Sequence, residues 1–191
     1  CRNELADAEP LSNAIAGVVP QSKFIVGYCG TLGTANAINV MLDVAKSTLG
    51  DLDIAYVLVG DGNLKKEIAM LIAEHNLSNV TLIDSIPKKQ VPSMLFLFDV
   101  CYVGFKKSSL YRYGNSLNKL AEYFMSKRPI IFSIDSPFKP VDDANAGITV
   151  GAEDVEGIVS AIYKLKSMPD AERKQLGDNG AKYAEEHYEF S

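Results

Sequence analysis

The chain has 191 residues, of which 47% are hydrophobic and 23% charged, and its formal net charge is −5. These values are ordinary for a globular domain with a hydrophobic core, and they argue against disorder. A general nucleic-acid binder normally carries a basic surplus, so the acidic balance argues against nucleic acid as a partner.

Residues 1–22 show weak periodicity, and we interpret them as an interdomain linker that leads into a domain spanning residues 23–191. The chain begins at Cys1 without a charged-then-apolar leader, so we expect no signal peptide and a piece of a longer protein. The longest apolar run, Val91 to Val103, is too short to span a bilayer and contains Asp99.

Short apolar runs alternate with segments of helical spacing along the rest of the chain. The predicted strands are Phe24–Tyr28, Ile54–Val59, Val80–Ile83, Val100–Val103, Pro129–Ser133 and Gly147–Val150. The predicted helices are Ala37–Ala45, Leu64–His75, Val91–Leu97, Leu117–Ser126, Val155–Met168 and Pro169–His187. Strands that are apolar without alternation, and that are separated by helices, indicate a parallel sheet covered on both faces. We therefore predict an α/β fold with a doubly wound, six-stranded, Rossmann-like sheet.

Ligands of such folds bind at the carboxyl ends of the strands, near the switch in strand order. The loop Gly30-Thr-Leu-Gly33 follows the first strand, and its glycines allow the backbone to approach a phosphate, although a simple tight turn is an equal alternative. The loop lacks the dinucleotide-binding and Walker A patterns, which argues against a dehydrogenase and a P-loop enzyme. We interpret Gly60-Asp-Gly62, after the second strand, as a structural turn.

The segment from residue 113 to residue 132 reads as a polar loop, a helix and a buried strand. Asn115 and Ser116 supply an N-cap before the first apolar residue, and an open helix start attracts anions. Lys119 and Glu122 are three residues apart, so we expect them to project together from one surface of this helix. Such a site suits a ligand with a phosphate end and a diol end, for example a nucleotide sugar. The alternative is a solvated surface pair.

The loop before this helix places Lys106, Lys107 and Arg112 among aromatic residues. At the ligand rim of an acidic protein we expect this positive charge to face phosphates, and a solvated loop is the alternative. Of the three we favour Arg112, because a guanidinium grips phosphate oxygens with two prongs.

The cysteines and histidines of the sequence do not indicate a metal site or a nucleophilic catalytic site. The cysteines are Cys1, Cys29 and Cys101, which we interpret as small core residues in a reducing compartment. With His75 and His187 as the histidines and no Cys-x-x-Cys, we expect no metal site and no cofactor. His75 is expected at a helix end on the opposite rim, and no catalytic residue can be assigned.

The chain resembles the C-terminal half of a retaining glycosyltransferase with two Rossmann domains (the GT-B type), of family 4 or group 1. The resemblance covers the chain from about Phe24 to Tyr188. The motifs that carry it are Val-Gly-Tyr-Cys-Gly-Thr-Leu-Gly (26–33), Leu-Val-Gly-Asp-Gly (58–62), Asn-Ser-Leu-Asn-Lys-Leu-Ala-Glu-Tyr-Phe (115–124), Arg-Pro-Ile-Ile (128–131) and Glu-Arg-Lys-Gln-Leu-Gly-Asp-Asn-Gly-Ala-Lys-Tyr (172–183).

The resemblance implies a donor site. Glu122 matches the second glutamate of the Glu-x7-Glu motif, which binds ribose. The diphosphate would be held by the helix start and a lysine, and the base by backbone after the third strand. The loop after the first strand would lie beside the diphosphate and the sugar. The implied donor-binding residues are Gly30, Thr31, Gly33, Ser85, Ile86, Arg112, Ser116, Leu117, Asn118, Lys119 and Glu122.

The chain also departs from the family pattern. The first glutamate of Glu-x7-Glu falls on Gly114, and the common Arg…Lys pair after the first strand falls on Thr31 and Asn36. Two cations for the diphosphate are therefore missing, and Lys119 with Arg112 would take their role.

The implied function is the transfer of a sugar with retention, from a UDP-linked donor to a polysaccharide or lipid-linked acceptor. The N-terminal acceptor domain is absent, so we expect this chain to bind the donor without turnover. We expect a cytoplasmic protein with a peripheral membrane contact through the absent domain. The alternatives are one half of a nucleotide-sugar 2-epimerase, and a non-catalytic nucleotide-binding module of the same fold.

Overall fold

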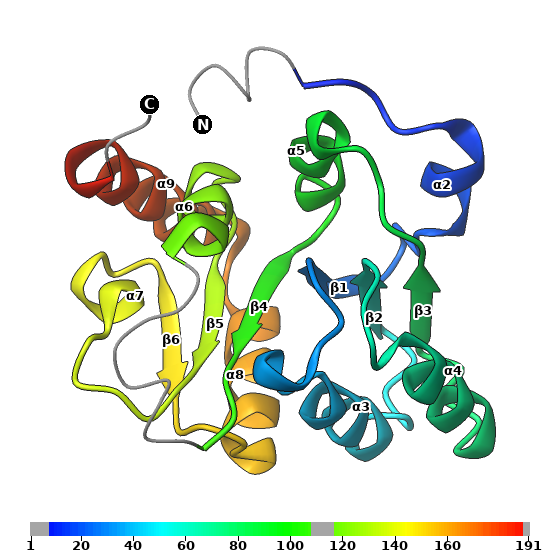
Figure 1. Ribbon diagram of the computed structural model, residues 1–191. Coiled ribbons are helices and arrows are strands. Elements are labelled where there is room, and N and C mark those ends of the chain that lie inside the picture. The colour runs from blue at the N-terminus through cyan, green and yellow to red at the C-terminus, as the bar shows by residue number, and fades with distance from the viewer. Residues whose placement is uncertain (1–7, 108–116, 189–191) are drawn as a thin grey trace.

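The computed structural model describes residues 8–107 and 117–188 (Figure 1). Six parallel strands form one sheet in the order β3-β2-β1-β4-β5-β6. The strands are β1 (Phe24–Cys29), β2 (Ile54–Val59), β3 (Val80–Ile83), β4 (Val100–Gly104), β5 (Ile130–Ser133) and β6 (Gly147–Val150). This order is the doubly wound arrangement, which confirms the predicted fold class, and the strand order switches between β1 and β4.

Helices cover both faces of the sheet (Figure 1). One face carries α5 (Val91–Leu95), α6 (Leu117–Met125), α7 (Pro140–Asp143) and α9 (Asp170–His187). The other carries α3 (Ile38–Ser47), α4 (Lys65–Glu74) and α8 (Val155–Ser167). Two short 3-10 turns, η1 (Thr34–Asn36) and η2 (Lys88–Gln90), precede α3 and α5.

Strand β1 shows why both faces need cover. Successive side chains of a strand point to opposite faces. Ile25 and Cys29 pack with the α5, α6 and α9 layer, whereas Val26 and Tyr28 pack with the α3 and α8 layer. All four are at most 8% exposed, so neither face of the strand meets water. The result is a hydrophobic core on each side of the sheet, as expected for apolar strands without alternation.

The segment predicted as a linker contains a helix that the sequence did not predict. Helix α2 (Asn13–Val18) is capped by Ser12, whose side chain accepts from the backbone nitrogen of Ile15 at 3.3 Å. Val19, directly after the helix, is only 5% exposed. The described part of this segment, residues 8–22, is therefore folded against the domain, while its role between two domains stays a prediction.

The connection between α8 and α9 lies at the amino rim of the sheet, the edge at which the strands begin. Arg173 donates hydrogen bonds to three carbonyl oxygens at the end of α8, those of Leu165 (3.1 Å), Lys166 (3.3 Å) and Met168 (2.5 Å). The same side chain forms an ion pair with Asp170. Carbonyl groups in the last turn of a helix lack partners within the helix. Arg173 thus caps α8 at the rim opposite the carboxyl ends of the strands.

Candidate functional site

The candidate site lies at the carboxyl ends of β1 and β4, where the strand order switches. The loop of Gly30 to Gly33 follows β1, and α6 returns over the sheet to begin β5. An open α/β sheet offers its ligand crevice at this point. The predicted rim is therefore where the structure places the glycine loop and α6.

Lys119 is the central charged side chain of this rim. Its Nζ donates a hydrogen bond to the hydroxyl of Tyr28 at 2.7 Å and lies 4.4 Å from the centroid of the same ring. The Tyr28 hydroxyl in turn donates to the carbonyl oxygen of Thr31 at 2.6 Å. A chain of two hydrogen bonds thus joins helix α6 to the glycine loop. Lys119 is partly buried, unlike the solvated surface lysine of the alternative reading.

Burial alters the acidity of this amine. It lowers the pKa of Lys119 from 10.5 to about 8, while the negative charge of Glu122 works in the opposite direction. The hydrogen-bond acceptor of the ammonium is a neutral phenol, because burial raises the pKa of Tyr28. An anion that entered this rim would remove part of the cost of burying the Lys119 charge.

Glycine at position 30 makes room for the lysine. A Cβ at residue 30 would lie 2.7 Å from both Cε and Nζ of Lys119, closer than real Cβ contacts. Thr31 is exposed beside it, and Gly33 is buried. The side-chain amide of Asn36 donates to the Thr31 carbonyl oxygen at 2.9 Å and fixes the loop from its far end.

The second glycine loop, after β2, supports the first one. A Cβ on Gly60 would lie 1.9 Å from the carbonyl oxygen of Gly30, a distance that no side chain can adopt. The backbone nitrogen of Leu32 donates to the carbonyl oxygen of Asp61 at 2.8 Å. The Asp61 carboxylate accepts from the nitrogen of Gly62 at 2.8 Å. These contacts confirm the structural interpretation of Gly60-Asp-Gly62.

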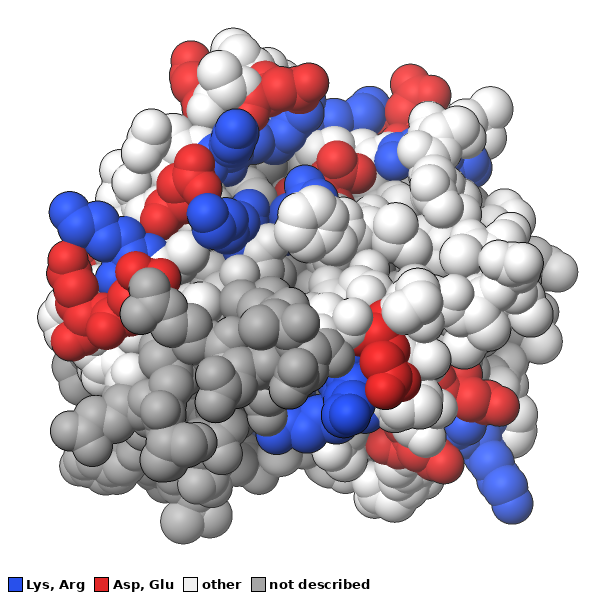
Figure 2. All heavy atoms as spheres, turned by 90° about the horizontal axis from the view of Figure 1, so that it is seen from above, with Lys and Arg blue, Asp and Glu red and all other residues white. Residues whose placement is uncertain are grey.

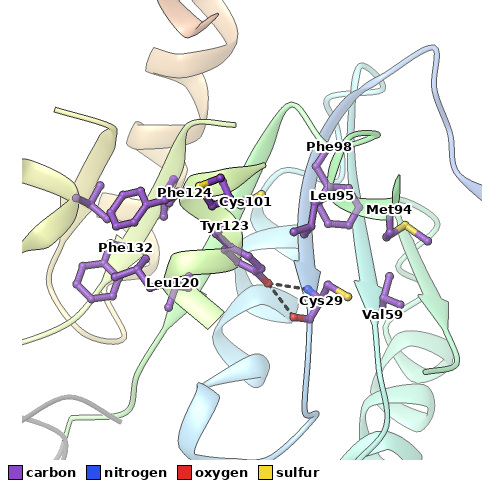
Figure 3. Packing of buried hydrophobic residues seen from close by; sticks show 14 of the residues in the cluster. Cys29, Val59, Met94, Leu95, Phe98, Cys101, Leu120, Tyr123, Phe124 and Phe132 are labelled. Atoms are coloured by element: carbon purple, nitrogen blue, oxygen red, sulfur yellow. Dashed lines mark hydrogen bonds between the residues drawn. The ribbon is translucent and has the colours of Figure 1, made fainter. Parts of the chain in front are cut away.

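Glu122 lies one turn after Lys119 on α6 and is partly buried. Burial of the Cys29 thiol raises its pKa to about 12, and the negative charge of Glu122 adds to this effect. The contact of Lys119 with Tyr28 places the ammonium at the end of β1, and the carboxylate of Glu122 is close enough to act electrostatically on Cys29 at the same strand end. Tyr123 follows Glu122 on the same helix, and its hydroxyl forms hydrogen bonds to the backbone of Cys29 (Figure 3).

The other predicted donor-binding residues stand as follows. Ser85 and Ile86 follow β3 on the same rim; Ser85 is exposed, and Ile86 packs against the α5 and α6 layer. Arg112 and Ser116 lie outside the described residues. For Leu117 and Asn118 the helical backbone of α6 is described, but not the side chains.

Tyr28 and Tyr123 were not predicted as site residues. Both are at most 1% exposed and stand within apolar runs, so their sequence context indicates core packing. The available signal was the position of Tyr28, two residues before Gly30, and the spacing of Tyr123, four residues after Lys119. A spacing of four places two side chains on one face of a helix.

Metal ligands and membrane spans were also sought in residues 8–107 and 117–188. This part of the chain holds no cluster of three or more His, Cys, Asp or Glu side chains that could bind a metal. Within the same residues no helix combines the length and apolarity needed to cross a bilayer. Cys29 and Cys101 are buried free thiols, as predicted. On the face over α2, α5, α6 and α9, acidic and basic side chains intermingle (Figure 2).

A separate cavity of about 390 Å³ opens at the amino rim, between the ends of α5 and α6 and the start of α9. Its charged side chains are largely matched within the protein. Lys127 lies 3.5 Å from Asp178. Arg128 donates to the carbonyl oxygen of Phe96 at 2.6 Å and covers the Phe96 ring. The cations Lys127 and Arg128 of this cavity therefore already have partners within the protein.

Comparisons with known proteins identify a family from the sequence and related folds among solved structures. A sequence profile described as Glycosyl transferases group 1 matches residues 23–167. No curated protein sequence matches the chain. Three solved structures illustrate the likeness of fold, with low sequence identity throughout.

A variant of TarM from S. aureus, solved with UDP, superposes with a TM-score of 0.72 at 22% identity, over 88% of this chain and 33% of that one. HepE from Anabaena, solved with UDP-glucose, superposes with a TM-score of 0.74 at 14% identity, over 94% of this chain and 50% of that one. The C-terminal domain of LpcC, a group 1 protein from Francisella tularensis, superposes with a TM-score of 0.71 at 19% identity, over 97% of this chain and 98% of that one. The chain thus spans a third to a half of TarM and HepE, and nearly all of the LpcC domain.

Proposed function

The chain belongs to the group 1 glycosyltransferases, and we propose that it is the donor-binding domain of such an enzyme. Its ligand is a nucleotide diphosphate sugar, with UDP as the favoured nucleotide. TarM and HepE support this choice, because their structures were solved with UDP and UDP-glucose.

The observation that carries the proposal is the partly buried ammonium of Lys119 at the glycine loop. It lies at the switch point of the sheet, next to Gly30, and its acceptor is the neutral hydroxyl of Tyr28. With a pKa of about 8 the amine is mostly charged at neutral pH. A diphosphate beside it would form charge-assisted hydrogen bonds, which are roughly twice as strong as neutral ones.

The chemistry asked of this domain is electrostatic. When the sugar leaves, negative charge develops on the diphosphate, and Lys119 and the start of α6 would stabilise that charge. Glu122 would accept hydrogen bonds from the ribose hydroxyls, and backbone at Ser85 and Ile86 would hold the base. Gly30, Thr31 and Gly33 would lie beside the diphosphate and the sugar, and Arg112 would add a second cation.

The rest of the reaction requires a second domain. We propose that an N-terminal domain supplies the acceptor site, a polysaccharide or lipid-linked acceptor, and a peripheral membrane contact in the cytoplasm. Transfer proceeds with retention in this proposal. The chain alone then binds the donor without turnover, and sugar transfer by the chain alone at the rate of a complete enzyme would contradict it.

Isothermal titration calorimetry tests the donor site. The unaltered chain is titrated with UDP and with GDP, and the UDP titration is repeated with Glu122→Ala. A matched control is Glu172→Ala, an exposed carboxylate in the first turn of α9. We expect binding of one diphosphate, weakened by Glu122→Ala and unchanged by Glu172→Ala. Equal affinity of all three proteins would refute the role of Glu122, and no binding of either diphosphate would refute the proposed function.

A further inference from the structure

The pairing between β1 and β4 ends before β1 itself ends. Their ladder joins Val26 to Val100 and Gly27 to Cys101, whereas the ladder between β1 and β2 continues to Cys29 and Val59. Backbone groups of alternate residues in a strand face opposite neighbours. The carbonyl oxygen of Ile25 accepts from Asp99, just before β4, so the odd-numbered residues of β1 face β4. The N–H and C=O of Cys29 therefore point into the widening gap at the switch point.

A tyrosine hydroxyl from α6 fills this gap (Figure 3). The hydroxyl of Tyr123 accepts from the backbone nitrogen of Cys29 at 2.8 Å and donates to the carbonyl oxygen of the same residue at 3.0 Å. Tyr123 has no exposed surface (0%), and burial raises its pKa well above the ordinary value, so the phenol keeps its proton. One hydroxyl can donate one hydrogen bond and accept another, and Tyr123 does both here.

This contact joins the two elements of the candidate site. On the strand side, Cys29 directly precedes Gly30. On the helix side, Tyr123 follows Glu122 and lies one turn after Lys119. The hydroxyl therefore sets how far α6 stands from the end of β1, and with it the distance between the Lys119 ammonium and the glycine loop.

We propose that Tyr123 is the positioning residue of the donor site: its hydroxyl replaces a missing strand partner of Cys29 and holds α6 at the height at which Lys119 reaches a diphosphate. The residue touches no ligand and acts through Lys119. The inference rests on the proposed donor site, and it names the residue on which the geometry of that site depends.

Tyr123→Phe removes the hydroxyl and keeps the ring. Tyr56→Phe is the matched control, because Tyr56 has 0% exposure and its hydroxyl lies 2.8 Å from Thr48 Oγ1, in the core of the other face. Tyr123→Phe loses two buried hydrogen bonds to the Cys29 backbone and Tyr56→Phe loses one to Thr48, so both variants should unfold at a lower temperature. In calorimetric titrations with UDP we expect the affinity to fall about tenfold for Tyr123→Phe, and to change less than about twofold for Tyr56→Phe. Equal UDP affinity of Tyr123→Phe and the unaltered chain would overturn the proposal.

A double-mutant cycle with Lys119→Met separates positioning from a general loss of stability. If Tyr123 acts through Lys119, Tyr123→Phe should weaken UDP binding little or not at all once Lys119 is replaced. Additive losses in the double variant would contradict action through Lys119. Residues in one network are expected to show such coupling, whereas independent sites add.

Hydrogen exchange of the Cys29 amide tests the contact between the Tyr123 hydroxyl and Cys29 without a ligand. We expect much faster exchange of this amide in Tyr123→Phe, with the protection of β2 amides retained. Unchanged protection at Cys29 would overturn the proposed contact. If the unaltered chain binds no UDP, the donor-site proposal fails, and the exchange measurement still decides whether Tyr123 closes the gap.

Discussion

The two rims of the sheet use their cations differently. At the amino rim, Arg173 is bound by helix carbonyls and by Asp170, and Lys166 lies 3.1 Å from Asp51 and 4.0 Å from Asp53. At the carboxyl rim, Lys119 donates to a neutral phenol, and burial depresses its pKa. Both rims carry charge, but their side chains contact different partners.

The difference shows how a structural cation can be told from a ligand-binding one. A cation that caps a helix stabilises the fold as it stands. A partly buried cation with a neutral acceptor costs free energy until an anion arrives. Lys119 has such an acceptor, lies against Gly30 at the switch point of the sheet, and has a pKa that burial lowers, so the carboxyl rim is the better candidate site despite the cavity at the other rim.

Loss of the Lys119 ammonium should have the largest effect on binding. We expect Lys119→Met to weaken UDP binding about 100-fold, or about 2.7 kcal/mol, because the diphosphate loses its partly buried counter-charge. Uridine, which has no phosphate, should bind as before. Lys166→Met is the control at the amino rim and should leave UDP affinity unchanged. Calorimetry with UDP and uridine measures both affinities, and equal losses for the two ligands would rule out a diphosphate role for Lys119.

Loss of Arg173 should affect stability instead. Arg173→Met removes three hydrogen bonds to carbonyl oxygens at the end of α8, and we expect the free energy of unfolding to fall by about 2 kcal/mol. UDP affinity, measured at a temperature where the variant is folded, should stay within about twofold. Urea denaturation followed by circular dichroism measures the first quantity. A large loss of UDP affinity at full folding would break the distinction between the rims.

The change of UDP affinity with pH should be smaller than the effect of Lys119→Met, and it should depend on Lys119. The protonated amine of Lys119 attracts the diphosphate, so affinity should fall as pH rises through its pKa of about 8. Between pH 7 and pH 9 we expect a loss of about tenfold, since the phosphates of UDP are already ionised in this range. The slope should vanish in Lys119→Met. A pH-independent affinity of the unaltered chain would show that the charge of Lys119 does not contribute.

Stability without ligand should change with pH in the opposite direction. The folded-state pKa of Lys119 lies below its unfolded value of 10.5, so the unfolded chain holds this proton more tightly. Its contribution to the free energy of unfolding should therefore increase as pH rises from about 8 to about 10.5. Comparison with Lys119→Met isolates this contribution from other titrating groups.

The sheet could be predicted from the sequence because its strands are uniform apolar runs. The bounds of β2, β3 and β6 match the prediction, and the other strands differ by a residue at one end. Helix α2 was missed, because six residues cannot display helical periodicity and its stability comes from the Ser12 cap and tertiary packing. The resulting sheet is the half of a GT-B fold that the group 1 resemblance implied.

The site was predicted less completely. Lys119 and Glu122 could be placed at the rim because helical spacing and sheet topology fix where α6 begins. The inward turn of Lys119 toward Tyr28 could not be predicted, because it depends on a tyrosine that looks like any core residue of β1. The same holds for Tyr123, whose hydroxyl matters only because β1 and β4 diverge.

The space above Gly30 has a consequence for engineering. The aliphatic end of Lys119 occupies the volume that a side chain at residue 30 would need. Loop and helix are consequently interlocked, although 89 positions separate them in the sequence. A designer who exchanges the loop after β1 must keep glycine at residue 30 or redesign α6 as well, since the two segments cannot be treated as separate modules.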